Sequence, residues 1–421
     1  MAAIPSSDPV FFLRHDWAQP LTERLTWATE VLRKANGEEV RTPLRLLPRR
    51  QITYFVGHDP LMRALVADWA EQYQGLSALY PLPHQGVCVR RAAPAGTSAL
   101  TIDANAWTSG LYRPTYPAVS YDSRGPTASS DPRALSLLLH DGGWQIVAVT
   151  AEAPGVLYLD GPLIDDAPAG AVLMPLRQGR CTQAVALDQW SGGWAGGTLT
   201  VQIDAALDVK LVVAPATDPV LKTLPAWPDG DWAETLSASA QSALTAFDFS
   251  QADPAWRRDD DVPMTTFSRS VTATGQEAAD WLERLYAARG RAGGFWLADG
   301  LAPDMRLASV AFPGTTVLDL DGAPAVAGLW RQDAAVRIGM SLDHRVAAYA
   351  TCAAPSDTNL VLDIPGLSDF APAGSAVTRL LPCRLDADAV ELGWIAPQTV
   401  QLQFTARRIA APLISDGGGG Y

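Results

Sequence analysis

One segment of this 421-residue chain occurs twice. Residues 157–190 read LYLDGPLIDDAPAGAVLMPLRQGRCTQAVALDQW, and residues 360–394 read LVLDIPGLSDFAPAGSAVTRLLPCRLDADAVELGW. Both segments contain Leu-x-Leu-Asp, then Ala-Pro-Ala-Gly, then a strand pattern that ends in Trp. A steady offset of about 203–204 residues separates them, and such a constant spacing is typical of a repeat. The chain is therefore predicted to contain one module twice.

A shorter match extends the repeat toward the start of each copy. The dipeptide Asp68-Trp69 recurs as Asp280-Trp281, at an offset of about 212 residues. Large aromatic side chains bury much apolar surface and are typical of protein cores. We therefore expect two equivalent pairs of core positions, Trp69 with Trp281 and Trp190 with Trp394.

The first copy opens with the pattern of a β-hairpin. An alternating apolar face predicts one strand through Leu25, Trp27, Thr29 and Val31. The pair Asn36-Gly37 follows, and both residue types tolerate the positive φ of a tight turn. A second extended segment is predicted after this turn and resumes at residues 51–56.

A helix is predicted behind the hairpin. Apolar residues recur every four positions at Leu61, Leu65, Trp69 and Tyr73. Asp59 and Pro60 suit the cap and first position of a helix, and Gly75 suits its end. In the second copy, Thr274 and Glu277 have the spacing of a capping box, and Gly290 marks the end of the helix that contains Trp281.

Short strands separated by turn-forming residues are predicted after each helix. The candidates in the first copy are residues 135–139, 145–149, 156–159 and 198–203. The glycine-rich stretch 192–197 is interpreted as a hairpin tip between two strands, because no helix follows that could hold a phosphate. This spacing predicts a small β-sandwich or barrel in each copy.

The predicted fold class is α+β, mainly β, with a tandem duplication of a hairpin-and-helix unit followed by a β domain. Two or more domains are expected at this length. The predicted organisation is 1–89 and 90–213 for the first copy, a Pro-rich linker over 214–231, 232–300 and 301–412 for the second copy, and a flexible tail over 413–421.

Charge and hydropathy exclude several classes of function. The net charge of -13 argues against a nucleic-acid groove, because phosphate binding needs a positive surface. The chain contains no apolar run of about 20 residues and no basic segment followed by an apolar core at its start. We therefore expect neither membrane insertion nor a signal peptide.

The motifs of common catalytic and metal sites are missing from the sequence. The five histidines are scattered, and no HExxH, GxSxG or GxxxxGK[ST] pattern occurs. Asp259–Asp261 and Asp319–Gly322 are interpreted as solvated turns, since neither has the full spacing of a calcium loop. The sequence thus predicts no catalytic residues, no cofactor and no metal. A carbohydrate-binding protein and a glycan hydrolase remain as alternatives; the first needs aromatic side chains clustered on one face, and the second needs paired carboxylates in one cleft.

The opening of the chain resembles tail proteins of long-tailed bacteriophages. The resemblance is carried over about the first 90 residues by Trp27, Thr29, Val31, Leu32, Gly37, Glu39, Arg41, Leu44, Arg45, Pro48, Arg49 and Arg50. It is similar in particular to baseplate or distal tail-tip proteins of siphovirus-like phages. The resemblance implies a structural virion protein without enzymatic activity, made in the bacterial host cytoplasm and located at the tail tip.

Such a protein is expected to form a ring. Three chains with two copies of one module each supply six similar positions, so a trimer with pseudo-six-fold symmetry is favoured and a hexamer is the second choice. The expected neighbours are tail tube, hub and fibre proteins, and DNA passes through without specific binding. Four arginines are interface candidates, expected to face carboxylates of another subunit or else solvent: Arg41, Arg45, Arg49 and Arg50.

Overall fold

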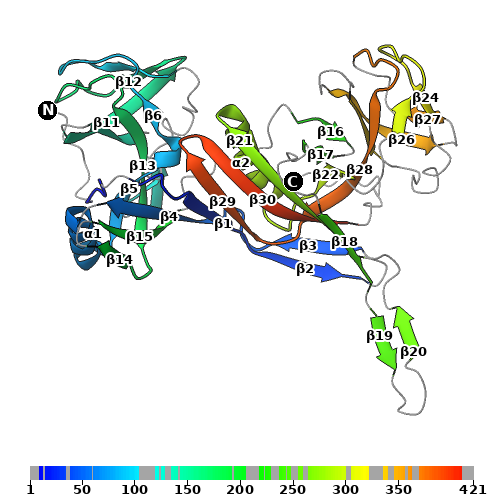
Figure 1. Cartoon of the computed structure of the whole chain (residues 1–421), viewed down its shortest axis with the longest axis horizontal. Coiled ribbons are helices and arrows are strands. Elements are labelled where there is room, and N and C mark those ends of the chain that lie inside the picture. The colour runs from blue at the N-terminus through cyan, green and yellow to red at the C-terminus, as the bar shows by residue number, and fades with distance from the viewer. Residues whose placement is uncertain are drawn as a thin grey trace.

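The structure is a computed structural model of the chain. It describes residues 9–12, 15–34, 38–58, 60–103, 119–122, 125–128, 134–140, 143–191, 194–204, 218–221, 223–228, 237–242, 244–247, 255–258, 264–299, 305–321, 335–339, 346–355, 359–362 and 369–409. Strands predominate, and the predicted α+β, mainly β class is confirmed. Figure 1 shows two β-rich lobes joined through a central region of long strands.

In the described part of the first half, four strands precede the helix α1 and the other strands follow it. Its elements are β1 (Leu21–Thr26), β2 (Thr29–Arg33), β3 (Glu39–Pro43), β4 (Arg49–His58), α1 (Pro60–Tyr73), β5 (Ser77–Pro81), the 3-10 helix η1 (Pro83–Gln85), β6 (Val87–Cys88), β7 (Ala99–Thr101), β8 (Val119–Asp122), β9 (Gly125–Ala128), β10 (Ala134–His140), β11 (Gly143–Ala153), β12 (Val156–Leu159), β13 (Val172–Cys181), β14 (Ala186–Ser191) and β15 (Trp194–Ile203).

The second half follows after two very short strands. Its elements are β16 (Val220–Leu221), β17 (Leu224–Pro225), β18 (Ser237–Gln241), β19 (Leu244–Phe247), β20 (Ala255–Arg258), β21 (Met264–Thr274), α2 (Gln276–Ala288), β22 (Phe295–Ala298), β23 (Met305–Leu307), β24 (Val317–Asp321), β25 (Ala335–Gly339), β26 (Val346–Pro355), β27 (Asn359–Leu362), β28 (Ala376–Leu385), β29 (Ala389–Ala396) and β30 (Thr399–Arg408).

The two halves pair their strands in the same order. The long strand β13 pairs with β5, β6, β10 and β15, and β28 pairs with β22, β23, β25 and β30. The strands before the helices, β4 and β21, pair with the last strands β15 and β30. The remaining strands of each β lobe follow as β10-β11-β12-β7 and β25-β26-β27-β24.

Each helix packs one apolar face against the sheet that precedes it. In α1, Pro60 takes the first position, where its missing N–H has no helical partner to lose, and Val66 and Trp69 are buried. In α2 the predicted capping box does not form. The N-cap is Gly275, with φ 60° and no side-chain capping bond, so the helix begins at Gln276, and its stability depends on buried residues such as Trp281.

One apolar core extends through both halves. It includes Leu25 and Tyr54 of the first half together with Trp281, Trp394 and Phe404 of the second. The upper β lobe of the first half has a separate core around Leu100, Leu157 and Leu173. The predicted separation into independent units at residue 90 is therefore bridged by β13, which pairs with strands on both sides of it.

Two local predictions differ from the structure. The strand expected through residues 25–31 is divided, because β1 ends at Thr26 and β2 begins at Thr29 with a different partner strand. Part of the predicted linker packs as a component of the second half. Arg284 donates two hydrogen bonds to Asp218, at 2.8 and 2.6 Å, and the ring of Trp227 stacks on Phe295 at 3.6 Å.

Candidate functional site at the junction of the two halves

The two halves are joined by a strand pair that has no chain connection near it. β1 of the first half pairs antiparallel with β29 of the second, from Leu21 opposite Trp394 to Thr26 opposite Ala389. The other edge of β1 pairs with β4. The sheet is therefore continuous across the junction, and both edges of β1 are satisfied.

A buried carboxylate lies at the centre of this junction. Glu23 of β1 is 1% exposed, and the guanidinium of Arg50 pairs with one of its oxygens. The indole Nε1 of Trp394 donates to the other oxygen at 2.9 Å, so a residue of the second half completes the set. A buried carboxylate is costly unless it is paired and hydrogen-bonded, and here both oxygens have partners.

His84 closes the cluster from η1. Its Nε2 lies 3.4 Å from Glu23 Oε2 and 3.4 Å from Arg50 Nη2, and its ring packs on Trp394 with centroids 4.6 Å apart. Burial, together with the charge of Arg50, lowers the pKa of His84 well below its ordinary value. The ring is thus neutral at pH 7, and its role beside Glu23 is packing and hydrogen bonding rather than an ion pair.

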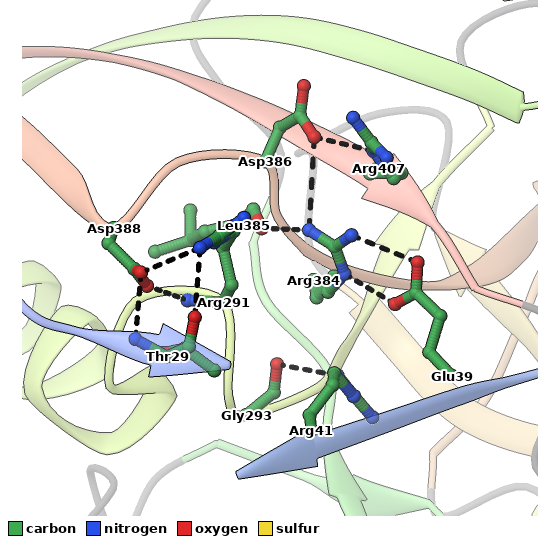
Figure 2. Close-up of polar contacts among 10 residues, drawn as sticks. All are labelled: Thr29, Glu39, Arg41, Arg291, Gly293, Arg384, Leu385, Asp386, Asp388 and Arg407. Carbon is green, nitrogen blue, oxygen red and sulfur yellow. Dashed lines mark hydrogen bonds and ion pairs between the residues drawn. The ribbon is translucent and has the colours of Figure 1, made fainter. Parts of the chain in front are cut away.

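The hairpin β2–β3 extends from the first half onto the second. Arg384 of β28 is 2% exposed and donates to both carboxylate oxygens of Glu39, at 2.6 and 2.9 Å (Figure 2). Burial alone raises the pKa of Glu39, but the hydrogen bonds and charge of Arg384 outweigh it and lower that pKa. Bidentate Arg–carboxylate pairs fix geometry as well as charge, so this contact sets the position of the hairpin.

A second carboxylate holds the base of the same hairpin. Asp388 Oδ2 accepts the backbone N–H of Thr29 at 2.9 Å, and its Oδ1 accepts the backbone N–H of Arg291 at 3.0 Å. The side chain of Arg291 also donates to the carbonyl of Thr29 at 2.9 Å (Figure 2). Burial raises the pKa of Asp388, but these hydrogen bonds lower it overall.

The four arginine candidates have different environments. Arg50 pairs with Glu23 inside the chain, so the expectation of a carboxylate from another subunit, or of solvent, does not hold for it. Arg41 donates to the carbonyl of Gly293 at 3.2 Å, and Arg45 donates to the carbonyl of Thr26 at 3.0 Å, and both are half-buried. Arg49 is exposed. Arg41 thus bonds to a residue of the second half, whereas Arg45 and Arg50 bond to residues of the first half.

The tryptophan pairs occupy equivalent elements but not equivalent positions. Trp69 and Trp281 lie in α1 and α2, and Trp281 lies about one turn nearer the start of its helix. In the hairpins, Gln189 pairs with Ala195 just before a bulge, and Trp394 pairs with Val400 just before the corresponding bulge. Trp190 is therefore one residue out of register with Trp394.

The sequence interpretation missed the carboxylates that complete the junction. Glu23, Glu39 and Asp388 are not among the predicted site residues, although their partners Arg50, Thr29 and Trp394 are singled out for other reasons. The contacts Glu23–Trp394, Thr29–Asp388 and Glu39–Arg384 join residues more than 300 positions apart, and local residue spacing cannot indicate such contacts. A comparison of the two similar halves could have drawn attention to these carboxylates, because they are charged residues at positions where the other half has none.

The described residues give little support for a metal site or for the carboxylate pair of a glycan hydrolase. No group of three or more His, Cys, Asp or Glu there could hold a metal ion, and no described helix is long and apolar enough to cross a membrane. Asp259–Asp261 lie outside the described residues, as do Trp107 and Trp330. Two surface depressions of about 400 and 310 Å³ contain one carboxylate each, Glu391 and Asp68, and so neither has the pair that a glycosidase needs.

Neither a scan against protein-family models nor a search of curated proteins gives a significant match to this chain.

Proposed function

We propose that this chain is a structural virion protein that forms a ring at the tail tip of a long-tailed bacteriophage. The observation that carries the proposal is the junction, where two units with the same strand order are joined edge to edge through β1 and β29. Edge-to-edge joining of like units is the geometry from which rings are built. Three chains then supply six similar units, which favours a trimer with pseudo-six-fold symmetry; a hexamer is the second choice.

The proposal includes a tandem duplication of the module. Its main support is that corresponding strand pairs in the two halves are separated by a constant number of residues. The pair Thr26–Arg49 of β1–β4 has its counterpart in Gln241–Met264 of β18–β21, and Thr29–Pro43 of β2–β3 has its counterpart in Leu244–Arg258 of β19–β20. All four offsets are about 215 residues, as expected of a repeat.

Side-chain contacts support the same alignment. The hydroxyl of Tyr54 donates to the carbonyl of Pro81 at 2.7 Å, and Arg269 Nη2 donates to the carbonyl of Ala298 at 2.9 Å. Tyr54 and Arg269 are themselves about 215 residues apart. Two different side chains therefore make corresponding hydrogen bonds, one in each unit. The same function at one position can thus be kept while the sequence changes.

The proposed neighbours are tail tube, hub and fibre proteins, with DNA passing through the ring. The net charge of -13 supports a conduit, because a negative lumen repels the DNA backbone and prevents it from adhering. The chain has no assigned enzymatic step or cofactor in this role.

Two measurements test the proposal. Native mass spectrometry of the purified protein is expected to give a species of three chains of 44.8 kDa, or of six, and electron microscopy is expected to show a ring at the tip of tails from infected cells. A strictly monomeric protein, or complete tails that lack this chain, would contradict it.

A carbohydrate-binding role is the second candidate. The depression of about 310 Å³ beside α1 is lined by four aromatic side chains: Phe12, Trp69, Tyr73 and Trp144. Trp144 is 44% exposed, and aromatic faces stack on sugar rings. A glycan array with Trp144→Ala tests this role, with the exposed Tyr158→Ala as control. Binding that only Trp144→Ala abolishes would favour it, and no binding by the native protein would exclude it for the glycans tested.

A further inference from the structure

The two strands that pair at the junction, β1 and β29, each have a counterpart in the other half, and these two counterparts are not paired with each other. β1 is bonded on both edges, by β4 and by β29. By the alignment above, the counterpart of β1 is β18, and that of β29 is β14. Among the described residues β18 pairs only with β21, and β14 pairs only with β15. Within the part of the chain that the structure describes, each strand therefore has one open edge of backbone N–H and C=O groups.

Lysine and proline, which often protect open edges, are absent from these two strands. Natural sheets protect open edges with lysine, proline or short strands, because an open edge accepts a further strand. β18 reads SASAQ and β14 reads ALDQWS, with no Lys, Arg or Pro in either. The residues of β18 are small, whereas Val185 and Leu187, just before and within β14, are half-buried apolar side chains.

The surface that is covered at the closed junction is uncovered at its counterpart near the open edge of β14. At the junction, the connection from β1 to β2 covers Gly290, where an added Cβ would lie 3.0 Å from Trp27 Cβ. Its counterpart Gly75, just after α1, has nothing within 4 Å. The hairpin β19–β20, the counterpart of β2–β3, extends away from the body of the chain (Figure 1).

We infer that β18 of one chain pairs antiparallel with β14 of the next copy of the same chain, in the register of β1–β29. This inference rests on the proposed ring and names the surfaces that close it. Transferring the register of β1–β29 places Ser237 opposite Asp188, Ala238 opposite Leu187, and Ser239 opposite Ala186. The contact is head to tail, so a rotation per chain that closes on itself gives a ring in which the open edges of β18 and β14 are paired in every chain. Counting along the sequence, the position of Glu39 corresponds to Pro254, so the Glu39–Arg384 ion pair is not repeated and strand pairing carries the contact.

Disulfide trapping tests the register. In a Cys88→Ser background, which removes the exposed thiol among the cysteines whose side chains the structure describes, Ser239→Cys with Ala186→Cys is expected to give covalent dimers and trimers on a non-reducing gel. The intrachain pair Arg24→Cys with Glu391→Cys is the positive control, because these exposed residues lie opposite each other in β1–β29. Ser239→Cys with Glu152→Cys, exposed on β11, is the off-site control and is expected to remain uncrosslinked.

A charge series tests the same contact without a covalent bond. Ser237→Glu places a carboxylate opposite Asp188 and is expected to weaken assembly about two- to fivefold per contact. Ser237→Lys at the same exposed position is expected to leave assembly unchanged or tighter. Combining Ser237→Glu with Asp188→Lys is expected to restore it, and this rescue cannot come from a folding defect.

The outcomes separate this inference from the proposed function. Rings in native mass spectrometry, with trapping no better than the off-site control and no charge rescue, would overturn the β18–β14 contact and leave the ring intact. Monomers at every concentration, with no trapping, would overturn both. Trapping with charge rescue would establish the contact.

Discussion

Glu23 illustrates how single residues join the two halves. Its carboxylate is buried, and its partners come from both halves, Arg50 on one side and Trp394 on the other. Pairs of this kind add little net stability compared with apolar residues, but removing one partner leaves a buried charge without compensation. The cluster therefore contributes more to the specificity of the β1–β29 pairing than to its stability.

We expect Glu23→Ala to lower the free energy of unfolding by about 3–5 kcal/mol, because the buried guanidinium of Arg50 then loses its carboxylate partner. Glu38→Ala is the control, since Glu38 forms an exposed ion pair with Lys34 and its loss is expected to cost less than about 1 kcal/mol. Urea denaturation followed by tryptophan fluorescence measures both. Equal losses for the two variants would show that the cluster does not hold the junction.

The stability of the folded chain is also expected to depend on pH, because single buried residues change their protonation on unfolding. Burial lowers the pKa of His84, and it lowers that of His15 to about 4. Both rings stay neutral in the folded chain but take up protons in the unfolded chain below pH 6.5. Stability is therefore expected to fall as the pH drops below about 6.5. Glu39 and Asp388 have lowered pKa values, so their contribution is present above pH 4.5 and 3.8 and is lost below these values.

Urea midpoints measured from pH 8 to pH 3 check this dependence. We expect a first decline below pH 6.5 and a second below about pH 4.5. Glu39→Gln is expected to be less stable at pH 7 and to show a smaller second decline, while its first decline is unchanged. A second decline of the same size in this variant would contradict the role assigned to Glu39.

At the scale of elements, the sequence predicted what depends on local pattern. The strand 156–159 and the helix after Pro60 occur where periodicity and turn residues place them, and β14 and β15 form the hairpin expected around the glycine-rich stretch. The sequence did not predict what depends on distant partners. Residue spacing could not show that β1 pairs with β29, or that Trp227 packs on Phe295. A bulge or one inserted residue shifts a strand to its other face, and the offset of Trp190 and Trp394 contains such a shift.

Two equivalent glycines distinguish the closed junction from the open end of the chain. Gly75 and Gly290 have φ values of 80° and 66°, where any other residue is strained by about 1–2 kcal/mol. An alanine Cβ at Gly290 would also lie 2.6 Å from Asp388 Oδ1, whereas at Gly75 it meets nothing within 4 Å. We expect Gly290→Ala to lose at least about 1 kcal/mol more than Gly75→Ala in the monomer, because Asp388 must move. Thermal unfolding of the two variants measures the difference, and equal losses would place the hairpin base away from Gly290.

At the scale of the whole molecule, the two halves share one core. Leu25 and Tyr54 belong to the same apolar cluster as Trp281 and Phe404, so the central strands of both halves share one core, beside the separate core of the upper lobe of the first half. Segments that share a core open together, and native-state hydrogen exchange reports such cooperative units. The central strands of both halves are thus expected to unfold as one cooperative unit.

This shared core gives the last prediction. Trp281→Ala, in the second half, should remove a large buried side chain and destabilise the core by about 3–5 kcal/mol. Because the core is continuous, we expect hydrogen-exchange protection to fall by a similar amount in β30 of the same half and in β4 of the other half. Phe312→Ala is the control, since Phe312 is 62% exposed and its loss should leave both strands unchanged. Mass spectrometry of exchanged peptides measures each strand separately. If β4 keeps its protection in Trp281→Ala while β30 loses it, the halves unfold independently, and the junction is a contact between two domains rather than a common core.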